Sequence, residues 1–187
     1  MVILTDVDGV LLSWTHSFEW WMKRKGYKKK ETSYFVDKQY GISDEKARVL
    51  VDHFNESAAI GFLPPLRDAI KYVRKFHEER GAVFHAITSF GQERYAVQLR
   101  EQNLKRVFGE TVFERIHCLP CGADKAEALK RYEGSGWIWV EDHAINANVG
   151  AGLGLNTFLM SHPYNWESSV DPDVKRVDTW KEIYEAI

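Results

Sequence analysis

Short apolar segments alternate with amphipathic helical segments along most of this 187-residue chain, and this alternation constrains the fold more than any other feature. Strands are expected at 2–4, 82–87, 113–119, 137–140 and 157–160. Helices are expected at 14–25, from 43 onward, and at 65–81, 92–103, 124–132, 144–152 and 178–187. Strands that alternate with helices form a parallel sheet with both faces covered by helices. The pattern therefore predicts an α/β fold.

Residues typical of helix ends set several of these boundaries. Ser13, Ser43 and Asp178 are expected N-caps, because their side-chain oxygens can accept from free backbone N–H groups. Pro65 suits the first turn of a helix, where its missing N–H is harmless. Gly81 is a good helix terminator.

One stretch breaks the alternation. Between the first strand and Pro64-Pro65 lie about fifty residues with helical patterns and no convincing strand, which is too long for a plain connection. We predict a helical cap at 14–63, inserted into a core formed by 1–13 and 64–187. Sites in open parallel sheets form at the carboxyl ends of the strands, so a lobe that leaves this edge would cover the site as a lid.

Two carboxylates follow the first strand in the sequence Asp6-Val7-Asp8-Gly9. Side chains two residues apart in extended chain point to the same side, so Asp6 and Asp8 repel and favour a nearby cation. Mg²⁺, which prefers oxygen ligands, is the natural candidate. The alternatives are an Asp-Gly hairpin turn and part of a calcium loop. A calcium loop fits poorly, because Gly9 comes too early and no Glu closes the loop.

Polar residues also follow the later strands. The second strand ends at Thr88-Ser89, Lys125 opens the helix after the third, and the fourth ends at Glu141-Asp142. Taken singly, these are a helix cap, a solvated lysine and a helix start. Their recurrence in order, each just beyond a strand, favours a shared site.

This order of residues resembles the haloacid dehalogenase superfamily of phosphatases. The matching segments are Asp6-Val7-Asp8-Gly9-Val10, Ile87-Thr88-Ser89, Lys125, and Glu141-Asp142 followed by Asn146. The resemblance implies a three-layer, Rossmann-like core with a small helical cap inserted after the first strand. It also implies Mg²⁺-dependent phosphoryl transfer.

The resemblance assigns roles to the acids. Asp6 would attack phosphorus and form an aspartyl-phosphate, and Asp8 would act as general acid and then general base. Asp6, the backbone carbonyl of Asp8 and Asp142 would hold Mg²⁺. Glu141 would be a further ligand or an outer partner of the metal site. The Glu-Asp pair departs mildly from the more common Asp-Asp.

The phosphate would be held by three other residues. By the same resemblance, Thr88, Ser89 with the neighbouring backbone amides, and Lys125 would bind the phosphate oxygens.

Substrate choice depends on the aromatic residues of the predicted cap. Trp14, Phe18 and Trp21 fall on one helical face, where they either form the cap's own core or stack on a flat substrate group. The segments 62–66 and 162–165 are similar to the 5'(3')-deoxyribonucleotidase branch, which also has a Thr-Ser pair at the second motif. We therefore expect a small phosphomonoester substrate, in the first place a nucleoside monophosphate.

Composition narrows the partners and the compartment. The net charge of −2 gives no overall basic field, so we expect neither a nucleic acid polymer nor a membrane as partner. No signal segment or membrane span is evident, which indicates a cytoplasmic protein, and a homodimer is compatible with the sequence. Cys118 and Cys121 lack the further ligands of a zinc site and are expected to be reduced thiols.

Two alternatives to a nucleotidase remain open. One is a phosphatase or phosphotransferase for another small phosphomonoester. The other is a nucleotide-binding protein without turnover.

Overall fold

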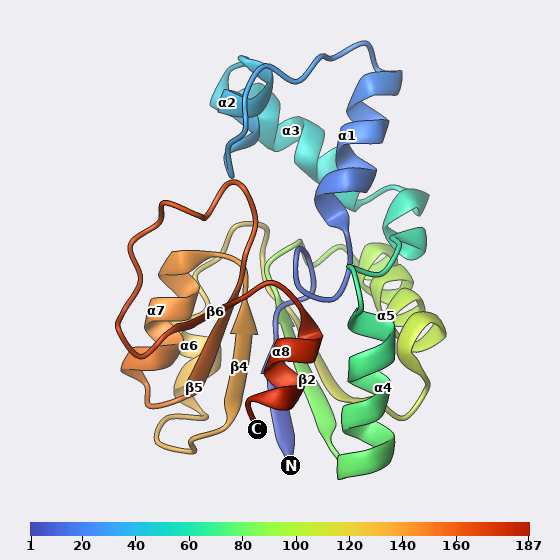
Figure 1. Cartoon of the computed structure of the whole chain (residues 1–187). Helices are drawn as coiled ribbons and strands as arrows, with labels where there is room; N and C mark the ends of the chain where they lie inside the picture. The colour runs from blue at the N-terminus through green and yellow to red at the C-terminus, as the bar shows by residue number, and fades with distance from the viewer.

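A computed structural model describes all 187 residues, and its centre is a six-stranded parallel sheet (Figure 1). The strands are β1 (Val2–Thr5), β2 (Val83–Thr88), β3 (Phe113–Cys118), β4 (Ile138–Glu141), β5 (Asn156–Met160) and β6 (Lys175–Val177). Their spatial order is β3-β2-β1-β4-β5-β6, so β1 lies in the middle and pairs with both β2 and β4. The strand order therefore reverses at β1, which is where α/β folds place their ligands. The predicted parallel α/β fold is confirmed.

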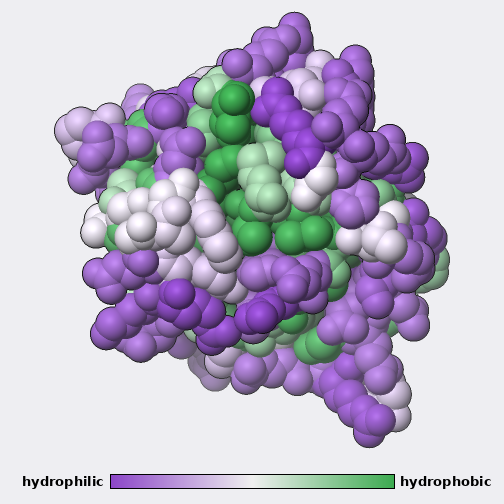
Figure 2. All heavy atoms as spheres, turned by 90° about the horizontal axis from the view of Figure 1, so that it is seen from below, coloured by the Kyte–Doolittle hydropathy of each residue, from purple (hydrophilic) through white to green (hydrophobic).

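Helices cover both faces of the sheet and complete three layers. One face carries α4 (Ala69–Arg80), α5 (Arg94–Phe108) and α8 (Trp180–Glu185), and the other carries α6 (Ala126–Lys130) and α7 (Ala144–Gly152). Ile3 packs in the first layer and Leu4 in the second, because successive strand side chains point to opposite faces. Viewed from below, hydrophobic residues lie near the middle and hydrophilic ones around the rim (Figure 2).

The chain between β1 and α4 forms a separate group of helices. It contains α1 (Trp14–Arg24), α2 (Val36–Tyr40), α3 (Asp44–Asn55) and the 3₁₀ turn η1 (Ala58–Phe62). Figure 1 shows α1, α2 and α3 beyond the carboxyl edge of the sheet, opposite the two termini. We call these three helices and their connections the lobe. The turn η1 contacts both α3 and α5, so it joins the lobe to the core. No helix in the chain is both long and apolar enough to span a bilayer.

Several helix boundaries agree with the sequence. The predicted helices at 14–25 and 144–152 are α1 and α7. The Ser43 hydroxyl caps α3 by accepting from the backbone N–H of Lys46 at 3.3 Å. Ser13 occupies the N-cap of α1, but its side chain makes no capping bond.

Two local predictions are wrong, and one strand was not predicted. Helix α4 begins at Ala69, because Pro65 instead pairs with Leu12 in an isolated bridge. Thr179, not Asp178, caps α8 by accepting from the backbone N–H of Glu182 at 3.4 Å. Strand β6 was not expected, because an edge strand of three residues, two of them polar, carries little pattern.

Candidate active site

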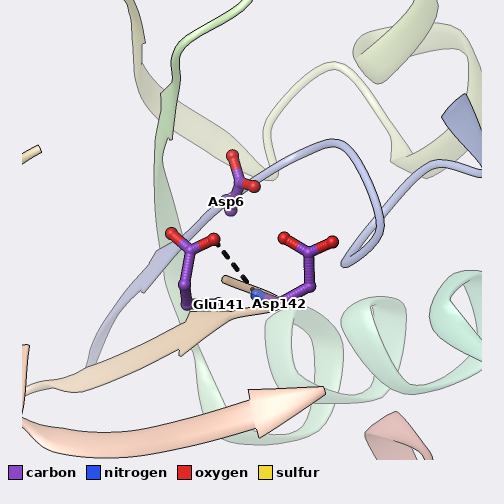
Figure 3. Close-up of side chains that lie close together, drawn as sticks. All are labelled: Asp6, Glu141 and Asp142. Carbon is purple, nitrogen blue, oxygen red and sulfur yellow. Dashed lines mark hydrogen bonds between the residues drawn. The ribbon is translucent and has the colours of Figure 1, made fainter. Parts of the chain in front are cut away.

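The carboxyl ends of β1 and β4 bring three acidic side chains together (Figure 3). One oxygen from each of Asp6, Glu141 and Asp142 lies within 4.8 Å of the others, and all three residues are buried. The backbone N–H of Asp6 donates to the Val140 carbonyl at 2.8 Å, which fixes the end of β1 beside β4. Gly9 then allows close approach, because its φ is +78° and an added Cβ would lie 2.1 Å from Asp142 Oδ2.

Lys125 bridges two of these acids from the loop before α6. Its Nζ lies 2.8 Å from Asp6 Oδ1 and 2.8 Å from Glu141 Oε2. Glu141 Oε1 accepts from the backbone N–H groups of Asp142 and His143, both at 3.1 Å, and the first of these bonds is drawn in Figure 3. Both oxygens of Glu141 are therefore engaged within the protein, and we assign Glu141 to positioning Lys125 and the end of β4.

Burial and charge shift the pKa values of these groups in different directions. Burial raises the pKa of Asp6 to about 7, against the pull of Lys125 and with the help of Glu141 and Asp8. Burial also raises the pKa of Asp142 well above its usual value, and the nearby Glu141 and Asp6 add to the shift. Burial would raise the pKa of Glu141, but Lys125 lowers it instead, with smaller contributions from the backbone N–H of His143 and the side chain of Asp142. The positive charge that the chain itself places near Asp6 and Asp142 is therefore too small to keep the pKa values of these two carboxyl groups in their usual range.

The residues present fit a magnesium ion. Asp6 and Asp142 offer buried carboxylate oxygens, and no backbone group donates to the Asp8 carbonyl. Hard oxygen ligands of this kind suit Mg²⁺. A cation between the two carboxylates would remove the repulsion that their raised pKa values express. The Asp8 carboxylate is not part of this acidic group and is bound by Arg100, so only the backbone carbonyl of Asp8 is a candidate ligand.

The Asp8 carboxylate is held by an arginine that the sequence did not point to. Arg100 of α5 donates from Nη1 and Nη2 to the two Asp8 oxygens at 2.7 and 2.8 Å. Arg100 is fully buried, its Nε has no partner, and its guanidinium lies 4.6 Å from the centre of the Phe90 ring. A charged residue on the buried face of a helix, alongside Ala96 and Leu104, is the signal that could have revealed it.

The predicted phosphate-binding residues lie at the same edge. Thr88 ends β2, is buried, and its hydroxyl makes no hydrogen bond within the chain. Ser89 Oγ donates to the Ala123 carbonyl at 2.9 Å. This bond ties β2 to the loop that carries Lys125, so the Ser89 hydroxyl positions that loop.

Four further residues around Asp142 were not predicted as site residues. The Tyr164 hydroxyl donates to Asp142 Oδ2, and Asn165 Nδ2 donates to the Asp142 carbonyl at 2.7 Å. Tyr34 of the lobe stacks on His143 with 4.4 Å between ring centres and meets Tyr164 edge-on at 5.7 Å. Tyr164 and Asn165 follow β5, so they lie at the carboxyl end of a strand like the other site residues. Nothing in the sequence places Tyr34 here.

The three aromatic residues proposed to bind substrate pack on one another. The Phe18 ring stacks on Trp14 at 4.5 Å and on Trp21 at 5.9 Å, and it meets Phe54 edge-on at 5.3 Å. Phe18 is fully buried and belongs to the core of the lobe. Trp14 also lines a cavity of about 300 Å³ that reaches Tyr164 of the core. Of the three, the structure brings Trp14 to a surface open to a ligand.

Solved structures with this fold are haloacid dehalogenase-like hydrolases. A haloacid dehalogenase-like family hydrolase from Streptococcus pneumoniae matches with a TM-score of 0.65 and 12% identity, over 99% of this chain and 97% of that one. A D,D-heptose 1,7-bisphosphate phosphatase from B. bronchiseptica, complexed with magnesium and phosphate, matches with a TM-score of 0.62 and 12% identity, over 99% and 96%. The chain therefore has the fold of these hydrolases, as its motifs implied.

A sequence relative comes from a bacteriophage. The chain is 28% identical over 196 aligned positions to an uncharacterized 32.4 kDa protein of the Gp30–rIII intergenic region of enterobacteria phage T4. The match covers 97% of this chain and 67% of the phage protein. No family model matches the chain.

Proposed function

We propose that this protein is a Mg²⁺-dependent phosphomonoesterase that acts through an aspartyl-phosphate on Asp6. One observation carries the proposal: Asp6 lies 2.8 Å from Lys125 and close to Asp142, at the carboxyl edge of the sheet. A nucleophile, a phosphate-binding cation and a metal ligand are thereby combined in one buried group. The bisphosphate phosphatase with bound magnesium and phosphate has the same fold, which supports this function.

The geometry suggests how the chain's own residues divide the reaction. An Asp6 oxygen attacks phosphorus while Lys125 binds a phosphoryl oxygen, and the bond from phosphorus to the leaving oxygen breaks. Asp8 gives its proton to that oxygen, then takes a proton from the water that displaces Asp6 from phosphorus. A Mg²⁺ ion held by Asp6, Asp142 and the Asp8 carbonyl would reduce the repulsion between the anionic nucleophile and the anionic phosphate.

The contact between Arg100 and Asp8 adds a condition to these reaction steps. Both oxygens of Asp8 accept hydrogen bonds from Arg100. Asp8 must therefore turn away from Arg100 before it delivers a proton to the leaving oxygen.

The proposed substrate is a nucleoside monophosphate, with the lobe acting as a cap over the site. The cavity of about 300 Å³ between lobe and core has Trp14 on one side and His162 and Tyr164 on the other. A flat base can stack on such rings. Gly9 also lines this cavity, so the cavity lies next to the loop that carries Asp6 and Asp8.

A substrate panel with and without Mg²⁺ tests the proposal. We expect Mg²⁺-dependent release of phosphate from p-nitrophenyl phosphate and from nucleoside monophosphates, and loss of both activities in Asp6→Asn. Asp173→Asn, which changes an exposed aspartate, is the matched control and should keep full activity.

Three outcomes would count against parts of the proposal. Full activity of Asp6→Asn would refute the nucleophile. A strong preference for sugar phosphates would refute the nucleotide substrate and favour another small phosphomonoester. Tight nucleotide binding without phosphate release would indicate a binding protein.

A further inference from the structure

A second cavity lies in the lobe and adjoins the one beside Trp14. Its volume is about 390 Å³, and it is lined by His16, Glu19, Trp20, Lys23, Tyr27, Lys28, Lys29 and Tyr40. We call it the lobe cavity. Three of its residues, His16, Glu19 and Lys29, also line the cavity between lobe and core. The two cavities therefore adjoin along α1, and we call the line from the Asp8-Gly9 loop past Trp14 to Lys23 the path.

The far end of this path carries an unbalanced positive charge. Residues 23–30 read Lys-Arg-Lys-Gly-Tyr-Lys-Lys-Lys and contain no acid, in a chain whose net charge is −2. Of these cations only Lys29 has a carboxylate partner, Glu19. Lys23 and Lys28 line the cavity and form no ion pair. Unpaired lysines are point charges that suit phosphate groups.

The lobe cavity also offers aromatic surface. Trp20 is 56% exposed, with the Arg24 guanidinium 4.8 Å from its ring centre. Tyr40 also lines the cavity, but it is only 4% exposed, and its hydroxyl, which has no partner within the chain, is closed to solvent. Trp20 therefore provides the aromatic surface of this cavity.

The length of the path decides what kind of ligand fits. Trp14 and Lys23 lie nine residues apart on α1, which is about 14 Å along the helix axis. A mononucleotide with its phosphate at Asp6 and its base beside Trp14 does not extend to Lys23. Proteins that bind single-stranded nucleic acid combine a basic groove for the backbone with aromatic rings for the bases, and the path has both.

We propose that the two cavities together bind a short single-stranded oligonucleotide, and that the preferred substrate is its terminal phosphate. This inference rests on the proposed phosphatase function. It departs from the expectation drawn from net charge, because the lysines of the lobe are concentrated in one segment while the acids are spread over the chain. In this arrangement Trp14 and Trp20 stack on bases, and Lys23 and Lys28 contact the backbone phosphates.

Steady-state kinetics on tetrathymidylate with a 5'- or 3'-terminal phosphate, compared with thymidine 5'-monophosphate, test this inference. We expect a KM about tenfold lower for one of the oligonucleotides, and this advantage should shrink as salt rises. Lys23→Gln with Lys28→Gln should remove the advantage and leave the monophosphate unaffected. The matched control is Lys25→Gln with Lys30→Gln, which removes the same charge from the same segment outside the cavity and should change the advantage by less than about twofold.

A second pair of variants tests stacking. Trp20→Ala should weaken oligonucleotide binding about tenfold, whereas Trp166→Ala, which alters another exposed tryptophan, should not. Equal KM values for oligonucleotide and monophosphate would overturn the inference. Equal effects of the two lysine pairs would also overturn it, because they would indicate attraction by the overall positive charge of the segment and not direct contacts of Lys23 and Lys28 with the oligonucleotide.

Fluorescence anisotropy with unphosphorylated, fluorescein-labelled tetrathymidylate separates the two proposals, because it needs no turnover. Hydrolysis of the monophosphate without oligonucleotide binding would refute this inference and leave the phosphatase proposal standing. Binding that depends on Lys23 and Lys28, without hydrolysis of any ester, would refute the phosphatase proposal and support the binding site.

Discussion

Replacing Arg100 by Met should destabilise the protein by about 2 kcal/mol. The change removes the two hydrogen bonds to Asp8, at 2.7 and 2.8 Å, and leaves an apolar chain of similar length against Phe90. Breaking a buried ion pair typically costs about 3–5 kcal/mol, because the remaining charge stays without a partner. The Asp8 side chain is 22% exposed, so water can solvate its carboxylate in part and reduce this cost.

The reverse change should be more harmful. Asp8→Asn leaves the Arg100 guanidinium, which is fully buried, without a carboxylate, and we expect a loss of about 3 kcal/mol. Urea unfolding of the two single variants and the double variant, at pH 7, gives their coupling energy, which we expect to be about 2 kcal/mol. Arg48→Met is the control, because the Arg48–Asp44 pair is 2.7 Å long but exposed, and its loss should cost less than about 0.5 kcal/mol.

Either of two results would refute this reasoning. A coupling energy below about 0.5 kcal/mol would show that the Asp8–Arg100 contact adds nothing to stability. A larger loss in Arg100→Met than in Asp8→Asn would show that the difference in burial does not govern the cost.

Three further predictions follow from single features. Gly9→Ala should lower phosphatase activity on p-nitrophenyl phosphate more than about tenfold, because the new Cβ would collide with Asp142, whereas Gly26→Ala has a similar φ of +86° but open space and should stay active. Phe18→Ala should cost about 3–5 kcal/mol in urea unfolding, and a loss under about 1 kcal/mol would show that the ring is not a core residue. Burial raises the pKa of the Cys118 thiol to about 11, and partial burial of the thiol together with the nearby Asp52 carboxylate raises that of Cys121 to about 11, so at pH 8 both are protonated. Mass spectrometry should show both reacting with iodoacetamide about a hundredfold more slowly than glutathione, and equal rates would contradict the shift.

The sheet could be predicted because parallel strands need helical crossovers, and the pattern of apolar residues along the chain indicates this alternation of strands and helices. The grouping of Asp6, Lys125 and Asp142 followed from the same fact, since each lies just beyond a strand. The direction of the strands alone thus places these side chains at the carboxyl edge of the sheet. No contact between them has to be known in advance.

The partners of the acids could not be predicted in this way. Arg100 and Asp8 are 92 residues apart, and their contact depends on how α5 docks against the loop after β1. Tyr34 reaches His143 through the path of an irregular segment, which no periodicity describes. The role of Phe18 was open for another reason, since an aromatic stripe looks the same whether it faces a core or a ligand.

The central position of β1 has a consequence for how the molecule folds. Strand β1 must pair with β2, which begins at Val83, and with β4, which begins at Ile138, and both of these strands are synthesised after it. Such distant pairings slow folding, because a long loop must close before the contacts form. Both edges of an apolar strand remain open until then, so a nascent chain that ends before β4 should be prone to aggregate. The acids at the carboxyl ends of β1 and β4 would come together only after β4 has been made.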